Sequence, residues 1–254
     1  MLYWSGMIKR KKMNALQDIL DLHTHTLASG HAYNTIWEMV QGAAEKNLEL
    51  LGITEHAPMM PGSCHEYYFS NLKALPRRIR GVQVLFGTEL NILDVNGSVD
   101  MSSELLQQMD VVIASLHLPC FSPASLEENT QAYENAMKNP LINIIGHPDD
   151  GRYPIDYERL VRAAKENHVL LEINNNSLNP VGFRKDTAPN DRKMLELCKE
   201  YEVPVILGSD AHVVTEIGNH ERAYKVLEEV EFPEELVVNR SVDEVLEFLN
   251  YGRK

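Results

Sequence analysis

Apolar and polar positions divide the chain into seven short apolar runs, and most of these are followed by a stretch with helical spacing. Runs such as Val111-Val112-Ile113-Ala114 are nearly continuous in apolar residues, which is typical of parallel strands that are buried on both faces. This pattern predicts strands over residues 19–26, 48–56, 82–92, 111–118, 141–147, 169–174 and 203–210.

The stretches between these runs have the period of an amphipathic helix. Between residues 157 and 167, for example, Leu160, Val161 and Ala164 fall on one helical face. The same reasoning predicts helices over residues 35–46, 103–109, 129–138, 157–167, 191–201, 221–230 and 242–250.

The connections are short and no low-complexity linker interrupts them, so we expect a single domain. About seven βα units in one domain predict an α/β fold, a distorted (β/α)7 TIM-like barrel. A doubly wound open sheet is the alternative. Both architectures place ligand sites at the carboxyl ends of parallel strands, so polar residues at strand ends are the ones to examine.

Composition limits the classes of partner. The net charge of -13 argues against a broad surface for nucleic acid or an anionic membrane, although bound metal ions would still allow an anionic substrate. The three cysteines, Cys64, Cys120 and Cys198, lack zinc-knuckle spacing and suit a reducing cytoplasm. No apolar stretch reaches the ~18 residues that a membrane span needs. We therefore expect a cytoplasmic protein.

Residues 1–18 precede the first predicted strand and contain the basic run Lys9-Arg10-Lys11-Lys12. No apolar segment follows this run, which argues against a secretory signal. We expect residues 1–18 to form a poorly ordered leader and place the barrel domain at residues 19–254.

Histidines and acids gather at the ends of the predicted strands. The first strand ends in His23-Thr24-His25, and both imidazoles of a His-x-His in a strand project from the same side because side chains alternate between faces. Buried polar groups are costly unless they are paired or ligated, so their recurrence at one mouth predicts a polynuclear metal site. The predicted ligands are His23, His25, His31, His56, Glu89, His117, His147, Asp210 and His212.

The donor set narrows the choice of metal. Imidazole and carboxylate without cysteine suit Zn²⁺, Mn²⁺ or Fe²⁺ and contain too much nitrogen for a Ca²⁺ or Mg²⁺ site. Nine ligands exceed what one four-coordinate ion needs. We therefore expect two or three ions, with Glu89 or Asp210 as a bridge.

The chain resembles the polymerase and histidinol phosphatase (PHP) family, and most of all its YcdX-like phosphatase branch. The resemblance covers roughly residues 19–250 and includes His31, His117 and Glu172-Ile173-Asn174-Asn175. Its other motifs are Asp21-Leu22-His23-Thr24-His25-Thr26, Thr54-Glu55-His56, Gly87-Thr88-Glu89, Gly146-His147-Pro148 and Gly208-Ser209-Asp210-Ala211-His212.

This resemblance implies a distorted (β/α)7 barrel with a trinuclear centre, commonly of zinc and sometimes with manganese or iron. It implies that Glu89 bridges two ions and that Asp210 belongs to the first of them. The first ion would be shared by His23, His25, Glu89 and Asp210, the second by Glu89, His117 and His147, and the third by His31, His56 and His212. Where the family more often has Asp-His, this chain has Glu55-His56, and we expect Glu55 to orient a ligand.

Such a cluster suits phosphoester hydrolysis. Two ions ~3.5–4 Å apart can clamp phosphoryl oxygens while a metal-bridging hydroxide attacks in line. The hypothesis is a phosphomonoester phosphatase with Glu89, Asp210 and His212 as catalytic residues, in which Asp210 accepts the proton of the water.

Substrate-binding candidates follow the sixth predicted strand. Arg184 and Lys185 lie in a loop where they would meet a phosphate, or they are solvated loop charges. The aromatic stretch at residues 65–69 is either a lid or loop packing. The asparagines at 174–176 either line the pocket or form caps and turns.

The expected partner is a small phosphorylated substrate. We expect no nucleic acid and no membrane as partners, and the sequence is compatible with a homo-oligomer. A metal-dependent nuclease is the first alternative, because the same family contains polymerase-associated exonucleases; it would need a basic, aromatic groove. A non-catalytic metal-binding or regulatory module is the second. Hydrolysis of C–N bonds on a similar barrel is the third, although the carbamylated strand-end lysine that it often uses has no counterpart here.

Overall fold

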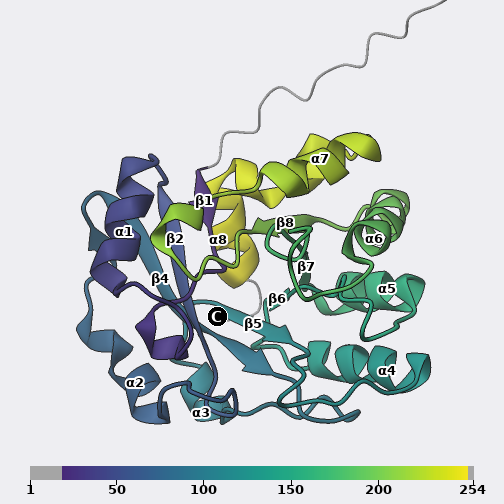
Figure 1. The fold of residues 1–254 in the computed structure, drawn as a ribbon, viewed down its shortest axis with the longest axis horizontal. Helices are drawn as coiled ribbons and strands as arrows, with labels where there is room; N and C mark the ends of the chain where they lie inside the picture. Colours follow the sequence, from purple (N-terminus) through teal and green to yellow (C-terminus); the bar gives the residue numbers. More distant parts are fainter. Residues whose placement is uncertain (1–18, 251–254) are drawn as a thin grey trace, which may run out of the picture.

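Seven parallel strands form the frame of the fold in a computed structural model that describes residues 19–250 (Figure 1). The order β1-β2-β4-β5-β6-β7-β8 follows the chain, and each neighbouring pair is parallel. The strands are β1 (Leu20–Asp21), β2 (Leu50–His56), β4 (Val82–Asn91), β5 (Val112–Ser115), β6 (Ile144–Ile145), β7 (Leu170–Asn174) and β8 (Val205–Gly208).

The sheet is nearly closed by an isolated parallel bridge between Thr24 and Ala211. The Ala211 carbonyl accepts a hydrogen bond of 2.9 Å from the His25 amide, and so the segment after β8 lies beside the segment after β1. This closure confirms the distorted seven-stranded barrel and excludes the open sheet. One short strand that the sequence pattern does not predict, β3 (Arg78–Ile79), pairs antiparallel with β4.

All seven predicted helices are present, and they surround the strands, with α1 and α2 on one side and α4, α5 and α6 on the other (Figure 1). The helices are α1 (Ile36–Glu45), α2 (Glu66–Asn71), α3 (Ser103–Leu106), α4 (Leu126–Met137), α5 (Tyr157–Asn167), α6 (Thr187–Tyr201), α7 (Glu221–Glu229) and α8 (Val242–Asn250). The 3-10 helices are η1 (Leu27–Ser29), η2 (Leu72–Ala74), η3 (Val214–Glu216), η4 (Glu234–Leu236) and η5 (Val238–Arg240). Within residues 19–250, every helix is too short or too polar to cross a bilayer.

Element ends differ from the predictions for local reasons. Helix α4 begins at Leu126 and not at 129, because Ser125 and Glu128 form a capping box before it. Strand β6 has only two residues, and the backbone of His147, two positions after its end, has a left-handed φ of 31°. The aromatic stretch at 65–69 forms α2, which the sequence pattern did not predict, and its Phe69 is buried in the core. The leader predicted at residues 1–18 lies outside the described residues.

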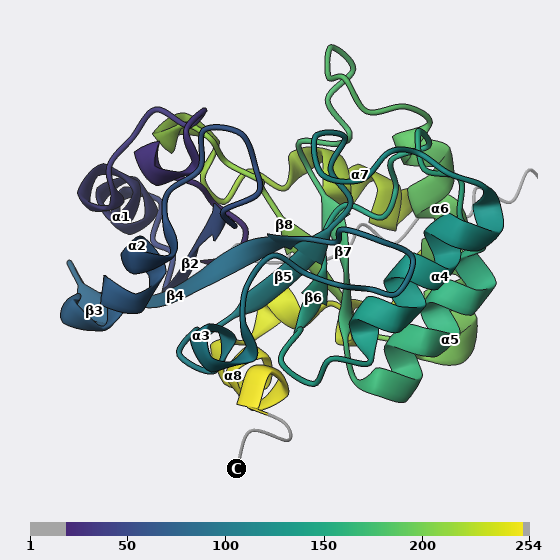
Figure 2. The same ribbon diagram turned by 90° about the horizontal axis from the view of Figure 1, so that it is seen from below.

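The interior of the barrel changes from apolar to polar along its axis. At the amino-terminal end, Leu50, Leu85 and Ile206 form one buried apolar cluster with Val245 and Leu249 of α8. Figure 2 shows α8 below the strands. Further along the strands, glycines leave room for polar groups. A Cβ at Gly208 would lie 1.9 Å from Glu172 Oε1, and one at Gly146 would lie 2.3 Å from Ser115 Oγ. The space beyond this layer is where the polar strand ends meet.

Candidate metal centre

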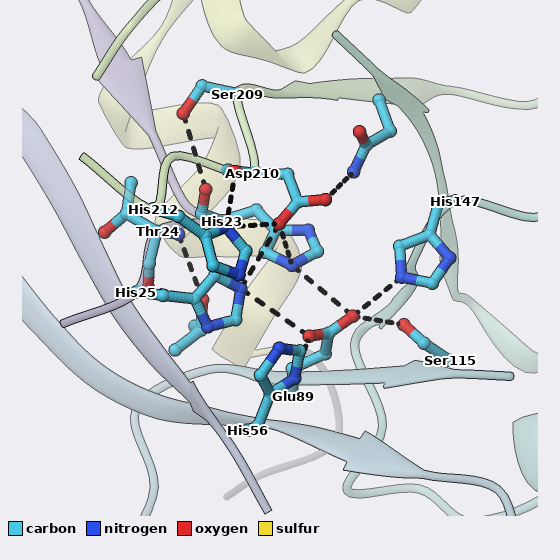
Figure 3. A network of polar contacts seen from close by, with 12 residues as sticks. His23, Thr24, His25, His56, Glu89, Ser115, His147, Ser209, Asp210 and His212 are labelled. Atoms are coloured by element: carbon cyan, nitrogen blue, oxygen red, sulfur yellow. Dashed lines mark hydrogen bonds and ion pairs between the residues drawn. The ribbon is translucent and has the colours of Figure 1, made fainter. Parts of the chain in front are cut away.

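The nine predicted ligands lie together at the carboxyl end of the barrel. Figure 3 labels His23, His25, His56, Glu89, His147, Asp210 and His212. Three groups can each hold a metal ion, since their ligand atoms lie within 4.8 Å of one another. The groups are His25, His56 and His212; His23, His25 and Asp210; and His56, Glu89 and His117. His31 and His147 join them, because His31 Nε2 is 3.1 Å from His212 Nε2 and His147 Nε2 is 2.9 Å from Glu89 Oε1. We call these nine residues the cluster.

Glu89 lies at the centre of the cluster. It is fully buried near the end of β4, and Ser115 Oγ donates a 2.7 Å hydrogen bond to its Oε1. Its two oxygens approach imidazoles from four other segments of the barrel. Oε1 is 2.9 Å from His147, 3.2 Å from His117 and 3.4 Å from His23, and Oε2 is 2.7 Å from His56 and 3.6 Å from His25.

The buried polar atoms of the cluster fit metal ions. His56 Nδ1 and Glu89 Oε2 are 2.7 Å apart, yet neither atom makes a hydrogen bond. Buried polar atoms are almost always satisfied, and atoms that face a common cation would account for these. Four further cluster atoms are buried without a hydrogen-bond partner, namely His23 Nε2, His25 Nε2, His117 Nε2 and His147 Nδ1. Imidazole and carboxylate donors in this arrangement suit zinc, manganese or iron.

The backbone at two ligands has an uncommon conformation. His147 has φ 31° and Asp210 has φ 54°, both in the left-handed region that non-glycine residues rarely adopt. Each residue lies two positions after the last residue of a strand, His147 after β6 and Asp210 after β8. Such conformations cost energy and are concentrated at functional sites. Here they turn the two side chains into the cluster.

Electrostatics keep most of these ligands in the form that binds a cation. Burial opposes charge on Glu89, but the imidazoles of His117 and His23 hold its pKa well below the usual range. Burial and the neighbouring His56 and His212 lower the pKa of His25, and the same causes lower the pKa of His31 to about 4. His23 differs, because Glu172 and Glu89 raise its pKa despite burial. The imidazoles of His25 and His31 are therefore neutral and ready to coordinate at neutral pH.

Glu172 is a functional candidate that the sequence reasoning missed as an individual residue. It is buried on β7, where its Oε1 accepts a 2.6 Å hydrogen bond from His23 Nδ1. Its Oε2 accepts bonds from the His147 amide at 2.8 Å and from Asn174 Nδ2 at 3.0 Å. Its sequence signal was a carboxylate inside the apolar run Leu170-Leu171-Glu172-Ile173. Glu172 thus fixes two ligands without lying among the predicted nine.

Other ligands are oriented in the same way. His25 Nδ1 donates a 3.0 Å hydrogen bond to Ser29 Oγ, and Ser29 donates to Glu55 Oε2 at 2.6 Å. Glu55 therefore acts through Ser29, in the orienting position that the sequence predicted. His117 Nδ1 donates to Asn91 Oδ1 at 2.8 Å. These contacts leave Nε2 of each imidazole pointing toward the cluster.

The two basic candidates are placed differently. The Arg184 side chain is only 8% exposed, and its Nη1 lies 3.1 Å from Asp210 Oδ2 at the cluster. Nη1 also donates to Ser177 Oγ at 2.9 Å, and Ser177 donates to Asp149 Oδ1 at 3.1 Å. Lys185 is exposed, and its carbonyl accepts a bond from the Gly151 amide. The structure brings Arg184 to the cluster and leaves Lys185 in solvent.

The asparagines at 174–176 divide between the two expected roles. Asn174 Nδ2 is 3.4 Å from Asp210 Oδ2, so this residue borders the cluster. Asn175 Oδ1 accepts bonds from the backbone amides of Arg222 and Ala223 and thereby caps α7.

A nearly closed parallel barrel with buried histidines and carboxylates that can hold metal ions at its carboxyl mouth defines the class of metal-binding α/β barrels. Within this class, the PHP domain matches residues 21–176, and the PHP-associated domain matches residues 189–250. The chain belongs to the PHP family, as its motifs predicted.

Curated relatives extend over nearly the whole chain. A protein of Clostridium novyi (strain NT) that is named a probable phosphatase is 46% identical over 231 residues, which cover 91% of this chain and 94% of the relative. A protein of Caldanaerobacter subterraneus subsp. tengcongensis with the same designation is 47% identical over 240 residues, or 94% of each chain.

Two solved structures share the fold. One is the histidinol phosphate phosphatase of Lactococcus lactis subsp. lactis complexed with zinc, L-histidinol and phosphate, with a TM-score of 0.59, 20% identity, and coverage of 85% of this chain and 95% of that one. The other belongs to an archaeal ribonuclease P with mature tRNA, with a TM-score of 0.55, 17% identity, and coverage of 92% and 93%. At these identities the likeness concerns the fold alone.

The contacts of Glu172 lead to a first prediction. Glu172→Gln should weaken metal binding by about 10- to 100-fold, because an amide cannot accept the three hydrogen bonds that this carboxylate accepts. Competition with a chelator measures the affinity. Glu166→Gln, on the exposed face of α5, is the matched control and should bind metal like the unchanged protein. Equal affinity in both variants would contradict the orienting role.

The lowered pKa of His31 leads to a second prediction, for chelator-treated protein. Between pH 6.5 and about 4 the unfolded chain protonates His31 and the folded chain does not, so the unfolded state binds more protons and stability falls as the pH falls. His31→Gln should lose less stability than the unchanged protein between pH 7 and pH 4.5, as measured by urea unfolding. Parallel losses in the two proteins would contradict it.

Proposed function

We propose that this chain is a metal-dependent phosphomonoesterase, a hydrolase that acts on the phosphoric ester bond of a small substrate. The observation that carries the proposal is the position of Arg184, a buried guanidinium 3.1 Å from the carboxylate of Asp210. A guanidinium beside a cation-binding cluster is suited to a phosphate that contacts both. The names of the curated relatives as probable phosphatases support the same reaction.

We further propose that the cluster holds three ions, with zinc as the first choice and manganese or iron as alternatives. His23, His25, Glu89 and Asp210 would share one ion, Glu89 would bridge to a second with His117 and His147, and His31, His56 and His212 would hold the third. The central position of Glu89 supports the bridge. The zinc of the Lactococcus lactis protein supports the choice of metal.

When bound, such ions clamp phosphoryl oxygens and lower the pKa of water toward neutrality. Within this proposal, the Arg184 guanidinium binds a phosphoryl oxygen, while Ser177 and Asn174 hold its Nη1 in place. The carboxylate of Asp210 takes up the proton of the attacking water. Glu89 keeps the imidazoles around it in position. The side chain of His212 is 22% exposed and borders the solvent into which the leaving group departs.

The proposal also includes the cellular compartment and the kind of partner. All three cysteines are free thiols, which supports action in a reducing cytoplasm. The partner is a small phosphorylated molecule. A nuclease would require a basic and aromatic groove, and the net charge of -13 argues against a broad basic surface for nucleic acid.

A screen of phosphomonoesters with metal-reconstituted protein tests the reaction, and Glu89→Gln tests the cluster. We expect this variant to lose both bound metal and hydrolysis, by at least about 100-fold, since removal of a mere supporting partner already costs 10- to 100-fold. Elemental analysis and phosphate release from p-nitrophenyl phosphate are the readouts. Glu196→Gln, on the surface of α6, is the control.

Two outcomes would overturn the proposal. Unchanged hydrolysis in Glu89→Gln would contradict the cluster mechanism. Cleavage of single-stranded DNA in place of small phosphomonoesters would favour the nuclease.

Arg184 and Lys185 form a matched pair for testing phosphate binding. Arg184→Met should lower kcat/KM by about 100-fold or more, because it removes a positioned charge donor from the transition state. Lys185→Met should stay within about threefold, since its side chain is in solvent and a surface charge contributes little. Equal losses in the two variants would show that bulk positive charge matters and that Arg184 has no specific role.

A further inference from the structure

Exposed apolar side chains are confined to one end of the barrel. Within residues 19–250, nine large apolar or aromatic side chains are exposed, and each lies between the carboxyl end of a strand and the first turn of the following helix. The opposite end is covered by α8. The nine are Leu27, Tyr33, Trp37, Met59, Tyr67, Leu118, Leu126, Val181 and Phe183.

Four of these residues belong to segments that carry the cluster. The Tyr33 amide donates a 3.0 Å hydrogen bond to the carbonyl of the ligand His212. Leu118 directly follows the ligand His117. Met59 is tied to the same segment, because its carbonyl accepts from Cys120 Sγ at 3.4 Å. We call Tyr33, Met59, Leu118 and Phe183 the rim.

Phe183 connects the rim with the phosphate-binding arginine. It directly precedes Arg184, and its ring centroid lies 5.5 Å from the Arg184 guanidinium carbon and 5.0 Å from that of Arg152. The ring is nevertheless 69% exposed. An aromatic ring held beside two guanidinium groups and open to solvent offers a fixed apolar surface to whatever is attached to a phosphate on Arg184.

The rim residues expose much of their apolar surface to solvent. Tyr33 is 75% exposed, Met59 58% and Leu118 45%, although single exposed apolar side chains are ordinary when they are scattered. Here they collect at the mouth of a chain with a net charge of -13, and grouped exposed apolar side chains mark a binding surface. A second copy or a large protein on this face would cover the mouth. The occupant that fits is therefore the organic part of the substrate.

We propose that the substrate is a phosphomonoester whose organic group is apolar or aromatic, and that the rim binds this group while Arg184 binds the phosphate. The inference rests on the proposed phosphatase function and narrows its substrate class. It makes the four rim residues determinants of specificity outside the cluster.

A series of n-alkyl phosphates from ethyl to octyl tests the proposal on the metal-loaded full chain. These leaving groups have nearly equal reactivity, so a trend in kcat/KM reports binding of the chain. We expect a rise of about two- to fourfold for each methylene that reaches the rim. Glycerol phosphate, a polar counterpart, should be used less well than propyl phosphate.

The outcomes separate this inference from the function on which it rests. If ethyl and octyl phosphates are hydrolysed equally, or if glycerol phosphate is preferred, the inference is overturned and the phosphatase stands. If no phosphomonoester is hydrolysed, the proposed function itself fails.

Variants then locate the apolar contact. Phe183→Ser and Tyr33→Ser should each reduce the octyl-to-ethyl ratio of kcat/KM by about fivefold or more. Leu126→Ser, at the start of α4, removes an exposed apolar side chain outside the rim and should leave the ratio unchanged. An equal fall in all three variants would overturn the assignment to the rim. So would a flat alkyl series together with loss of a dimer in the rim variants, as measured by sedimentation, because the rim would then be an interface between copies.

Discussion

The convergence of imidazoles on the buried carboxylate of Glu89 is the interaction around which this molecule is arranged. Its two oxygens meet histidines from segments as distant in sequence as residues 23 and 147. Only a barrel brings these segments to one point, because closure places the end of β8 beside the segment that follows β1. In an open sheet, Asp210 and His23 would lie at opposite edges. The cluster can therefore assemble only if the barrel closes.

The interior of the barrel changes from apolar to polar along its axis, and this separation lets the fold accommodate the buried polar cluster. Apolar residues fill the amino-terminal end and bury against α8, so stability resides there. The glycine layer, with Gly146 and Gly208, then admits the side chains of Ser115 and Glu172. Glu172 compensates for its own burial through three hydrogen bonds, two of them to cluster residues. The polar cluster at the carboxyl end therefore leaves the apolar packing at the amino-terminal end intact.

The strand-end rule let the sequence predict most of this picture, because parallel strands send their carboxyl ends to one mouth whatever their exact lengths. All nine residues of the cluster could be named although β6 has only two residues. The individual role of Glu172 could not be read, since it depends on which side chain lies across the barrel from β7. Arg184 is buried at the cluster and Lys185 lies in solvent because of the path of the loop that contains both. The path of a loop leaves no periodic pattern in the sequence. The start of α4 is set by the capping box of Ser125 and Glu128, a local motif that apolar periodicity does not reveal.

The same geometry couples metal binding to folding. Without a cation, the buried nitrogens of His23, His25 and His117 lack partners, and His147 and Asp210 hold left-handed backbone conformations. Both features cost stability in the folded state alone, because the unfolded chain hydrates these atoms and relaxes these angles. A bound ion offsets the first cost and fixes the second conformation in place. Part of the free energy of metal binding would therefore appear as stability of the barrel mouth.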